Sequence, residues 1–554
     1  MNGPAFGNEG DDWIELGTSD GAGGDNFDPL EASTILGHDV FITGGGFDEV
    51  DGEGGDDIMI GSEGEDHFGG GGGFDWVGYK FSRFGVSVDM LVNDLIEPPV
   101  AASNQGILDR FVQVEGLFGS DHGDILRGDH ADATTINVEG PQNSTLTADG
   151  IARISGLQAF LNEMLGVPTT SFGAGNIILG GGGSDIIEGR GGDDLIDGER
   201  TFNVRISVRE NLDGTGAEIA SFDSMKPMIP LMLNGTYNPG QLVIVREILL
   251  KPESFDTAVF TGNFSTLGVP DYLISRDTRG TADFADDIFT VTDTFIDGDG
   301  VDRLRGIERL QFNDIALVRD DATGNFVEQV AGTQQFGNFS PLGNIQVSGT
   351  VQVGQLLTAS VAGITDQDNA GGTLNGRPIS YIWQVDTFGD GIFEDIVALG
   401  GGNPATQLGN TFRVTPDLEG LALRVKAVYQ DDNGTLELVF STGTAPVAAG
   451  VFPTPAVLPA ESATVSPGGG LHLIRSDLQF MLEQIFISER HAAGEDLLSL
   501  LPNSRVPFGM RTVDGSLNNL VQGQSGFGAT DENFPSCCRS SSATREMKAL
   551  ASMA

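Results

Sequence analysis

The chain has 554 residues, enough for three or four domains of ordinary size, so a single compact fold is not expected. Its 79 Asp and Glu against 29 Lys and Arg give a formal charge of -50, which excludes nucleic acid as an expected partner because phosphate binding needs the opposite sign. Glycine contributes 81 residues while hydrophobic residues still make up 39%, so plain acidic disorder does not fit.

The sequence gives no sign of a membrane span or a signal peptide. No apolar run is long enough to cross a bilayer, and residues 1–12 are neither basic nor hydrophobic. The two cysteines, Cys537 and Cys538, are adjacent, so neither a disulfide framework nor a thiolate metal site is expected. Export, if it occurs, must use a route without a cleaved N-terminal signal.

A nine-residue repeat starts early in the chain. Five nonapeptides follow one another from residue 34 to 78, reading TILGHDVFI, TGGGFDEVD, GEGGDDIMI, GSEGEDHFG and GGGGFDWVG. The fourth and sixth positions hold, respectively, Gly37, Gly46, Gly55, Gly64, Gly73 and Asp39, Asp48, Asp57, Asp66, Asp75. A copy at 7–15, a degenerate copy from Gly119 and a second array at 171–197 add Asp12, Asp124, Asn176, Asp185, Asp194, Gly183 and Gly192.

This G-G-x-G-x-D-x-U-x pattern resembles the hemolysin-type calcium-binding repeat of secreted bacterial RTX proteins. The resemblance implies a parallel β-roll in which two nonapeptides form one coil, so that repeats two apart stack. Asp57 would then face both Asp39 and Asp75, and Asp48 would face Asp66. The other interpretation is a flexible linker rich in glycine and aspartate, which the strict register of five copies disfavours.

The repeat chemistry points to a cation. Strands in a sheet lie about 4.8 Å apart, where two carboxylates repel by roughly 1 to 3.5 kcal/mol. The first 79 residues contain 19 Asp and Glu and no Lys or Arg, so no internal counter-ion is available. Ca²⁺ accepts carboxylate and carbonyl oxygens in flexible geometry, whereas Mg²⁺ needs a tighter octahedron and zinc prefers His or Cys. We therefore expect these residues to bind calcium and to fold when they bind it outside the cell.

The region after the first array is expected to leave the roll and return. In residues 79–170, apolar residues from Ile151 to Leu165 fall at helical spacing and predict a helix packed on the core, in preference to a binding helix. The second array, 171–198, follows. Residues 199–335 contain strand-like segments and predict a β-rich module that caps the roll. There, Asp297, Asp299 and Asp302 fit a solvated acidic turn better than an ion site.

Residues 345–447 alternate polar and apolar positions, and they resemble an immunoglobulin-like or cadherin-like β-sandwich of bacterial surface proteins. Trp383 is expected in its core and Tyr429 in a late strand. Asp366 and Asp368 fit a plain turn better than a calcium loop. An extracellular protein or carbohydrate is the expected class of partner for the sandwich, and a Pro-rich linker follows at 448–470.

Residues 471–535 resemble the opening of the peroxidase domain in bacterial animal-type haem peroxidases, most clearly in RTVDGSLNNLV. The distal and proximal residues that such enzymes need lie beyond that opening, and His491 is expected on a helix surface. The resemblance therefore implies haem only in a parent protein. Residues 536–554 are unrelated to the family, which we interpret as a truncated or shifted reading frame, and the in-register repeat at residue 7 suggests that the chain starts within an array.

Two functions follow from these patterns. The first is a calcium-binding module of a secreted multidomain protein. The second is a fragment of a haem peroxidase that is catalytic only with missing sequence. The chain has no Walker lysine, no H-E-x-x-H and no G-x-S-x-G, so no enzymatic activity is expected from the chain itself. The predicted fold is mainly β, with parallel β-roll arrays, a β-rich capping module, a β-sandwich and a short helical C-terminal segment.

Overall fold

The computed structural model divides the chain into two compact units, residues 1–450 and 451–554. It describes residues 13–15, 37–43, 46–61, 64–92, 109–266, 268–295, 298–320, 322–396 and 409–450. Over these ranges the fold is mainly β, as predicted, and none of the helices there is long and apolar enough to span a bilayer. The predicted peroxidase-like segment, the tail and nearly all of the Pro-rich linker lie outside the described residues.

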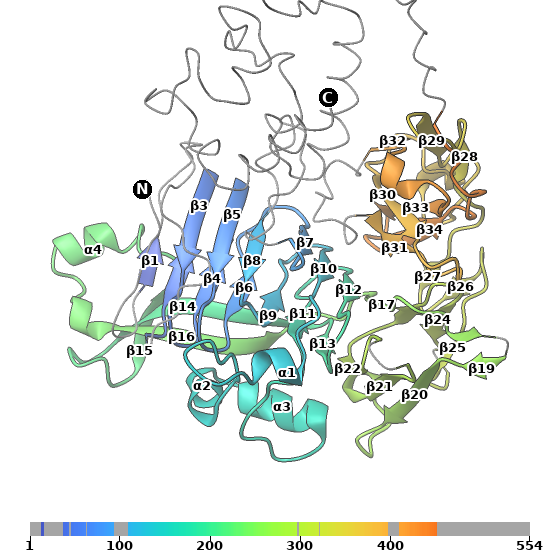
Figure 1. The fold of residues 1–554 in the computed structure, drawn as a ribbon. Coiled ribbons are helices and arrows are strands. Elements are labelled where there is room, and N and C mark those ends of the chain that lie inside the picture. The colour runs from blue at the N-terminus through green and yellow to red at the C-terminus, as the bar shows by residue number, and fades with distance from the viewer. Residues whose placement is uncertain are drawn as a thin grey trace, which may run out of the picture. The chain divides into compact units, whose positions relative to one another are not determined.

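The first part of the described chain is a β-roll with two walls of short parallel strands (Figure 1). The first wall consists of β1 (Trp13–Glu15), β2 (Val40–Ile42), β4 (Ile58–Ile60), β6 (Trp76–Gly78), β9 (Gly116–Phe118), β11 (Ile177–Leu179), β13 (Leu195–Asp197) and β22 (Val301–Arg305). The second wall consists of β3 (Gly46–Asp51), β5 (Gly64–Gly69) and β8 (Arg110–Val112), and of β7 (Ser87–Asp89), β10 (Ile125–Arg127), β12 (Ile186–Glu188), β17 (Thr257–Val259) and β23 (Arg309–Gln311).

Strand pairing in both walls follows the nine-residue period. In the first wall Val40 of β2 pairs with Ile58 of β4, and in the second wall Asp48 of β3 pairs with Asp66 of β5. Each offset is eighteen residues, or two nonapeptides. The expected stacking of repeats two apart is confirmed, because consecutive nonapeptides alternate between the walls.

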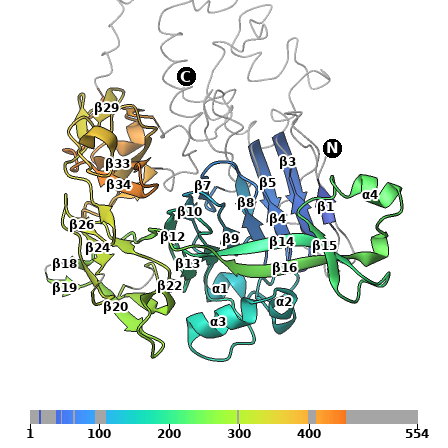
Figure 2. The same ribbon diagram turned by 180° about the vertical axis from the view of Figure 1, so that it is seen from behind.

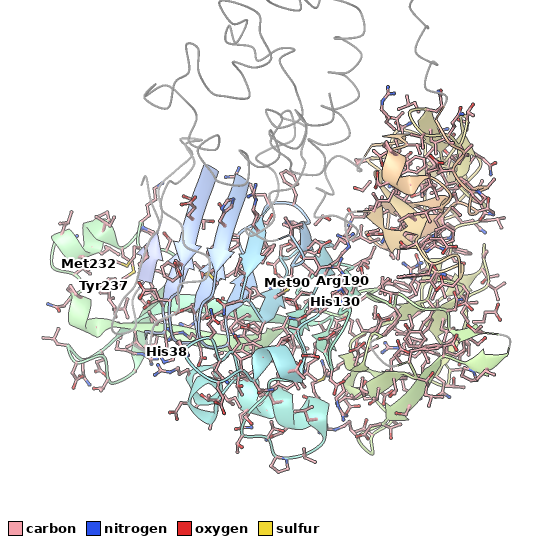
Figure 3. All side chains as sticks on the ribbon, in the orientation of Figure 1. His38, Met90, His130, Arg190, Met232 and Tyr237 are labelled. Atoms are coloured by element: carbon pink, nitrogen blue, oxygen red, sulfur yellow. The ribbon has the colours of Figure 1, made fainter. Side chains whose placement is uncertain are left out.

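The eighth-position residues of the repeats fill the roll interior. Phe41, Val50, Met59, Phe68 and Val77 are fully buried there, and Figure 3 shows Met90 among the side chains of this region. The short strands leave the seventh and ninth positions facing outward. In the first wall these positions are also apolar and belong to a second core: Val40, Ile58, Ile60 and Trp76. The first wall is therefore buried on both faces, which explains its nearly continuous apolar strands.

The insertion within residues 79–170 covers the outer face of the first wall (Figure 2). It contains α1 (Ala133–Ile136), α2 (Ala148–Arg153) and α3 (Leu157–Leu165). The prediction that its apolar side chains pack on the core is confirmed, but the prediction of one continuous helix is wrong. The backbone N–H of Ser155 donates to the carbonyl oxygen of Arg246, and Gly156 adopts a φ of 89°. Bonding to a neighbouring strand thus separates the two helices.

Residues 199–335 add further coils to the roll and also form a sheet outside it. A three-stranded antiparallel sheet leaves the roll after β13 and returns at β17: β14 (Arg200–Arg209), β15 (Glu218–Phe222) and β16 (Leu242–Leu250), with α4 (Ile229–Leu233) between the last two. Antiparallel strands then end both walls: β20 (Tyr272–Asp277), β21 (Ile288–Asp293), β24 (Ala316–Arg319) and β25 (Phe326–Glu328). These strands lie where the sequence predicts a cap.

Residues 345–447 form two antiparallel sheets around a common core. One contains β28 (Gln346–Ser348), β29 (Leu356–Ser360) and β32 (Thr411–Arg413), and the other contains β31 (Glu394–Asp395), β30 (Ser380–Asp386), β33 (Ala422–Gln430) and β34 (Leu436–Phe440). Trp383 and Tyr429 are both buried in this core, in agreement with their predicted positions.

Stacked coils leave no room for side chains at the fourth repeat position. A Cβ on Gly55 would overlap the carbonyl oxygen of Gly37 in the neighbouring coil, and Gly55 itself has a φ of 134°. We expect Gly55→Ala to lower the free energy of unfolding in calcium by about 3 kcal/mol or more, because backbone strain and overlap add. Urea denaturation measures this loss. Gly182→Ala is the matched control, since its added Cβ would meet nothing closer than 3.5 Å; an equal loss there would refute the packing argument.

Candidate metal centre

The sixth-position residues of the first wall form a ladder of hydrogen bonds from coil to coil. The backbone N–H of Asp39 donates to Oδ1 of Asp57 at 2.7 Å, and that of Asp57 donates to Oδ1 of Asp75 at 2.8 Å. The same pattern continues through Glu115 at 3.0 Å from Asp75 and, past Asn176, through Asp194 and Asp302. The predicted facing of Asp57 with Asp39 and Asp75 is confirmed.

The second wall has two shorter ladders of the same kind. In one, the backbone N–H of Asp48 donates to Asp66, and that of Asp66 donates to Asp109. The other runs through the later coils in the order Asp124, Asp185, Asp256 and Glu308. Each acid in a ladder therefore uses one carboxylate oxygen to hold the backbone of the preceding coil.

Four ladder aspartates have a second oxygen that no hydrogen bond satisfies. These are the Oδ2 atoms of Asp57, Asp75, Asp185 and Asp194, all on fully buried residues. A buried oxygen without a partner costs about 1 to 3 kcal/mol, and more when it is charged. Such atoms at four ladder positions indicate a missing positive group.

A main-chain carbonyl oxygen lies next to these carboxylate oxygens. A Cβ on Gly52 would come within 2.7 Å of both Oδ2 of Asp57 and the carbonyl oxygen of Gly70. A Cβ on Gly180 would come equally close to Oδ2 of Asp185 and the carbonyl oxygen of Gly198. First-position glycine thus leaves the space in which carboxylate and carbonyl oxygens converge. This donor set, with oxygen only, is the one that Ca²⁺ prefers.

Burial strongly disfavours the charged form of these acids in the metal-free protein. Desolvation raises the pKa of Asp75 well above its usual value, and the nearby charges of Asp57 and Glu115 raise it further. Desolvation also raises the pKa of Glu115 to about 8 and that of Asp124 to about 7. Protons would therefore compete with a cation for the same oxygens.

The predicted metal residues differ in how they fit a site. Asp66 and Asp124 use both oxygens, since Oδ2 of Asp66 accepts from Thr43 and Oδ2 of Asp124 accepts from the backbone N–H of Ser120. Asn176 is a neutral rung of the first ladder. Asp12 lies outside the described residues. The fourth-position glycines pack coil on coil, as described for Gly55, and those with left-handed φ are Gly55, Gly73, Gly183 and Gly192.

Sequence reasoning missed five ladder acids. They are Asp109, Glu115, Asp256, Asp302 and Glu308, and each is followed two residues later by an apolar or small residue that faces the roll interior. The acid-x-apolar core of the nonapeptide is the signal that could have found them. The predicted solvated turn is wrong for Asp299 and Asp302, which are 5% and 2% exposed, and Asp297 lies outside the described residues.

Asp366 and Asp368 in the acidic loop of the sandwich accept hydrogen bonds from the protein, whereas Oδ1 of Asn369 and Oδ2 of the nearby Asp431 are buried without a hydrogen-bond partner. Asp366 is buried and accepts from the hydroxyl of Tyr429 at 2.7 Å. Asp368 accepts from the backbone N–H of Phe339 at 2.6 Å and from Asn433 at 2.9 Å. These donors come from the protein, which favours the plain turn over a calcium loop.

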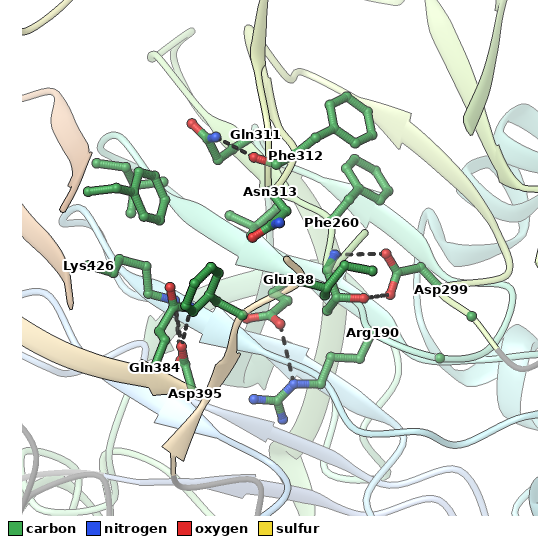
Figure 4. A pocket seen from close by; sticks show the side chains of 18 of the residues that line it. Glu188, Arg190, Phe260, Asp299, Gln311, Phe312, Asn313, Gln384, Asp395 and Lys426 are labelled. Atoms are coloured by element: carbon green, nitrogen blue, oxygen red, sulfur yellow. Dashed lines mark hydrogen bonds and ion pairs between the residues drawn. The ribbon is translucent and has the colours of Figure 1, made fainter. Parts of the chain in front are cut away.

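A cavity of about 250 Å³ lies between the second wall and strands β30 and β33 (Figure 4). Its charged side chains find partners within the protein. Arg190 pairs with Asp89 at 2.7 Å and Lys426 pairs with Asp395 at 3.2 Å. Arg424 lies 4.6 Å from the rings of both Phe393 and Phe440 and donates to Gln384. The charged side chains Arg190, Lys426 and Arg424 of this cavity therefore interact with other protein groups.

Two described histidines, His38 and His67, adjoin the ladder acids Asp39 and Asp66 in the sequence. His38 lies in the turn before β2 (Figure 3). Its Nδ1 accepts from the backbone N–H of Asp56, so the imidazole already has a partner. Oxygen donors therefore dominate around the ladder residues, which argues against zinc.

Comparison with known proteins adds little to this geometry. No family model and no curated protein matches the chain. Among solved structures, the chain is similar to the crystal structure of domains A168–A170 from titin, at 13% identity and a TM-score of 0.13, over 38% of this chain and 72% of that chain. A likeness at this level does not bear on function.

The raised pKa values of the buried acids predict that the metal-free protein becomes less stable as the pH rises. The folded state keeps protons on Glu115 and Asp124 that the unfolded state releases near pH 4, so the free energy of unfolding should fall as pH rises from about 4 to about 8. Urea denaturation in EDTA at several pH values measures this. Saturating calcium should reduce the fall, because the positive charge of bound ions favours the deprotonated form of the neighbouring acids. A metal-free stability that rises over this range would contradict the prediction.

Proposed function

We propose that the roll binds calcium ions and that the chain is a calcium-dependent structural module of a secreted multidomain protein. The observation that carries this proposal is the buried Oδ2 atoms of Asp57, Asp75 and Asp185, each without a hydrogen-bond partner and each beside a main-chain carbonyl oxygen. The nonapeptide pattern, which resembles the RTX repeat, supports it independently.

Each part of the coil has a distinct role in this proposal. The Oδ1 atom of a ladder aspartate such as Asp57 fixes the register by accepting the backbone N–H of the preceding coil, and the Oδ2 atom would hold the ion. Glycines such as Gly52 keep that space free of side chains. A bound Ca²⁺ would supply the positive charge that the first 79 residues lack.

Calcium affinity sets where the module would fold. Extracellular calcium modules bind at about 10⁻⁴ to 10⁻³ M, so they are empty inside a cell and loaded outside it. A chain that stays unfolded until it leaves the cell suits export without a cleaved signal peptide. We propose secretion by such a route on this ground.

Equilibrium dialysis of the full chain against ⁴⁵Ca tests the proposal. We expect several ions per chain at about 10⁻³ M calcium, together with a gain of β-type circular dichroism. Magnesium at the same concentration is the control and should produce neither. Absence of binding at this concentration would refute the proposed function.

The haem peroxidase fragment is the alternative, and only the sequence of residues 471–535 favours it. A haem-bound chain would show a Soret band after reconstitution with hemin. We expect none, because the family's haem ligands lie beyond this segment. A Soret band that survives gel filtration would favour the alternative.

A further inference from the structure

Three acids outside the nonapeptide arrays converge near the closing end of the roll. Glu199 follows β13, Asp256 precedes β17 and Glu308 precedes β23. One carboxylate oxygen from each lies within 4.8 Å of the others, and their exposed fractions are 4%, 0% and 2%. Three buried carboxylates at this separation need positive charge or protons.

One carboxylate oxygen of this cluster has no hydrogen-bond partner. Glu308 is satisfied by Arg319 at 2.8 Å and by the backbone N–H of Asp256 at 2.9 Å. Asp256 accepts from Asp185 and from the hydroxyl of Ser254. Oε1 of Glu199 accepts from the backbone N–H of Ser254 at 2.8 Å, but Oε2 is buried and has no hydrogen-bond partner.

The local charge is also unbalanced. Among the described residues, Arg319 is the cationic group that forms an ion pair with these acids, so the cluster would carry two uncompensated negative charges if all three acids were ionised. Asp185, whose own Oδ2 is buried without a partner, lies on the adjoining rung of the ladder. A carbonyl donor is close as well, since a Cβ on Gly198 would meet both Oδ2 of Asp256 and the carbonyl oxygen of Gly306.

We propose that Glu199, Asp256 and Glu308 form a further divalent-cation site for Ca²⁺, in which Glu199, an acid outside the ladders, joins the last two rungs of the second-wall ladder. This site offers three carboxylates to one ion, whereas each coil of a ladder offers one carboxylate. Calcium affinity rises with the number of charged ligands. The site binds more tightly than the ladders for that reason. It also joins the point where the β14–β16 sheet leaves the roll to the point where the chain returns, so the ion fixes the closing coils.

The site deepens the proposed function and rests on it, because Glu199 adds a third carboxylate to two rungs of a ladder. Proton sharing among the three acids is the competing explanation of their proximity. It predicts that calcium has no effect on the cluster, and the test is chosen to separate the two.

Equilibrium dialysis of the full chain at about 10⁻⁶ M calcium, below the range of extracellular modules, isolates the tight site. We expect one ion per chain, and we expect Glu199→Gln to abolish it, although the variant keeps the acceptor for Ser254. Glu253→Gln is the matched control, since Glu253 is a neighbouring exposed acid. Asp57→Asn should also retain the tight ion, because Asp57 lies in the first-wall ladder and not in this cluster.

Each outcome decides the proposal. A chain that binds no ion at this concentration, or a Glu199→Gln variant that binds as well as wild type, would overturn it. If Glu199→Gln fails to fold, Glu199→Asp keeps the charge and withdraws the oxygen, and it should weaken binding at least about tenfold; unchanged affinity there would also overturn the proposal. If the wild-type chain binds the tight ion but none of the weaker ions, the ladder sites are refuted and this site stands.

Discussion

Removing calcium at about pH 8 should unfold the roll and leave the β-sandwich folded. Amide hydrogen exchange of the full chain measures this, because it reports each strand separately. We expect protection in β2, β4 and β6 to fall by at least about a hundredfold in EGTA, and protection in β30 and β33 to stay within about threefold. EGTA preloaded with calcium is the control.

The different chemistry of the two parts explains this expectation. Asp57, Asp75 and Asp194 are buried in the roll and each has an Oδ2 atom without a hydrogen-bond partner, and stacked carboxylates repel by roughly 1 to 3.5 kcal/mol per pair. Buried charges of the sandwich are neutralised by the protein, as Asp395 is by Lys426 at 3.2 Å. If the roll kept its protection in EGTA, calcium would not hold the coils together.

The nine-residue period was enough to predict strand register in the first array. Position eight had to face inward and position six had to meet its equivalent two repeats away, and Phe41 and Asp57 do so. The later coils could not be predicted in the same way. Asp256 and Glu308 occupy ladder positions in segments without the repeat glycines, and only long-range strand pairing reveals them.

Two errors show why local pattern was insufficient elsewhere. Helical spacing from Ile151 to Leu165 was correct for the buried face, but the backbone of Ser155 bonds to β16, which a periodicity cannot show. DGDGVD lacks the remaining positions of an EF-hand loop, which favours a solvated turn for Asp302 over an ion site. Asp302 is buried because β22 pairs with β13, which brings Asp302 level with Asp194.

The Asp57 side chain should show opposite effects with and without calcium. Oδ1 of Asp57 accepts the backbone N–H of Asp39, and the buried Oδ2 has no hydrogen-bond partner. Asp57→Asn keeps an acceptor for Asp39 and removes the charge. We therefore expect it to stabilise the metal-free roll, because the neutral amide removes the cost of protonating a carboxylate on burial, and to destabilise the calcium-loaded roll by about 2 kcal/mol or more.

Asp57→Ala removes both functions and should lower the free energy of unfolding in calcium by about 3 kcal/mol or more. Urea denaturation of each variant, with calcium and with EDTA at about pH 6, gives the four values needed, because partial protonation keeps the metal-free roll folded there. Asp121→Asn is the control, since Asp121 is an exposed acid in a degenerate repeat copy. If Asp57→Asn destabilises the metal-free and calcium-loaded forms equally, Oδ2 serves packing or hydrogen bonding and does not bind a cation. Only a bound ion would make the contribution of this charge to stability depend on calcium.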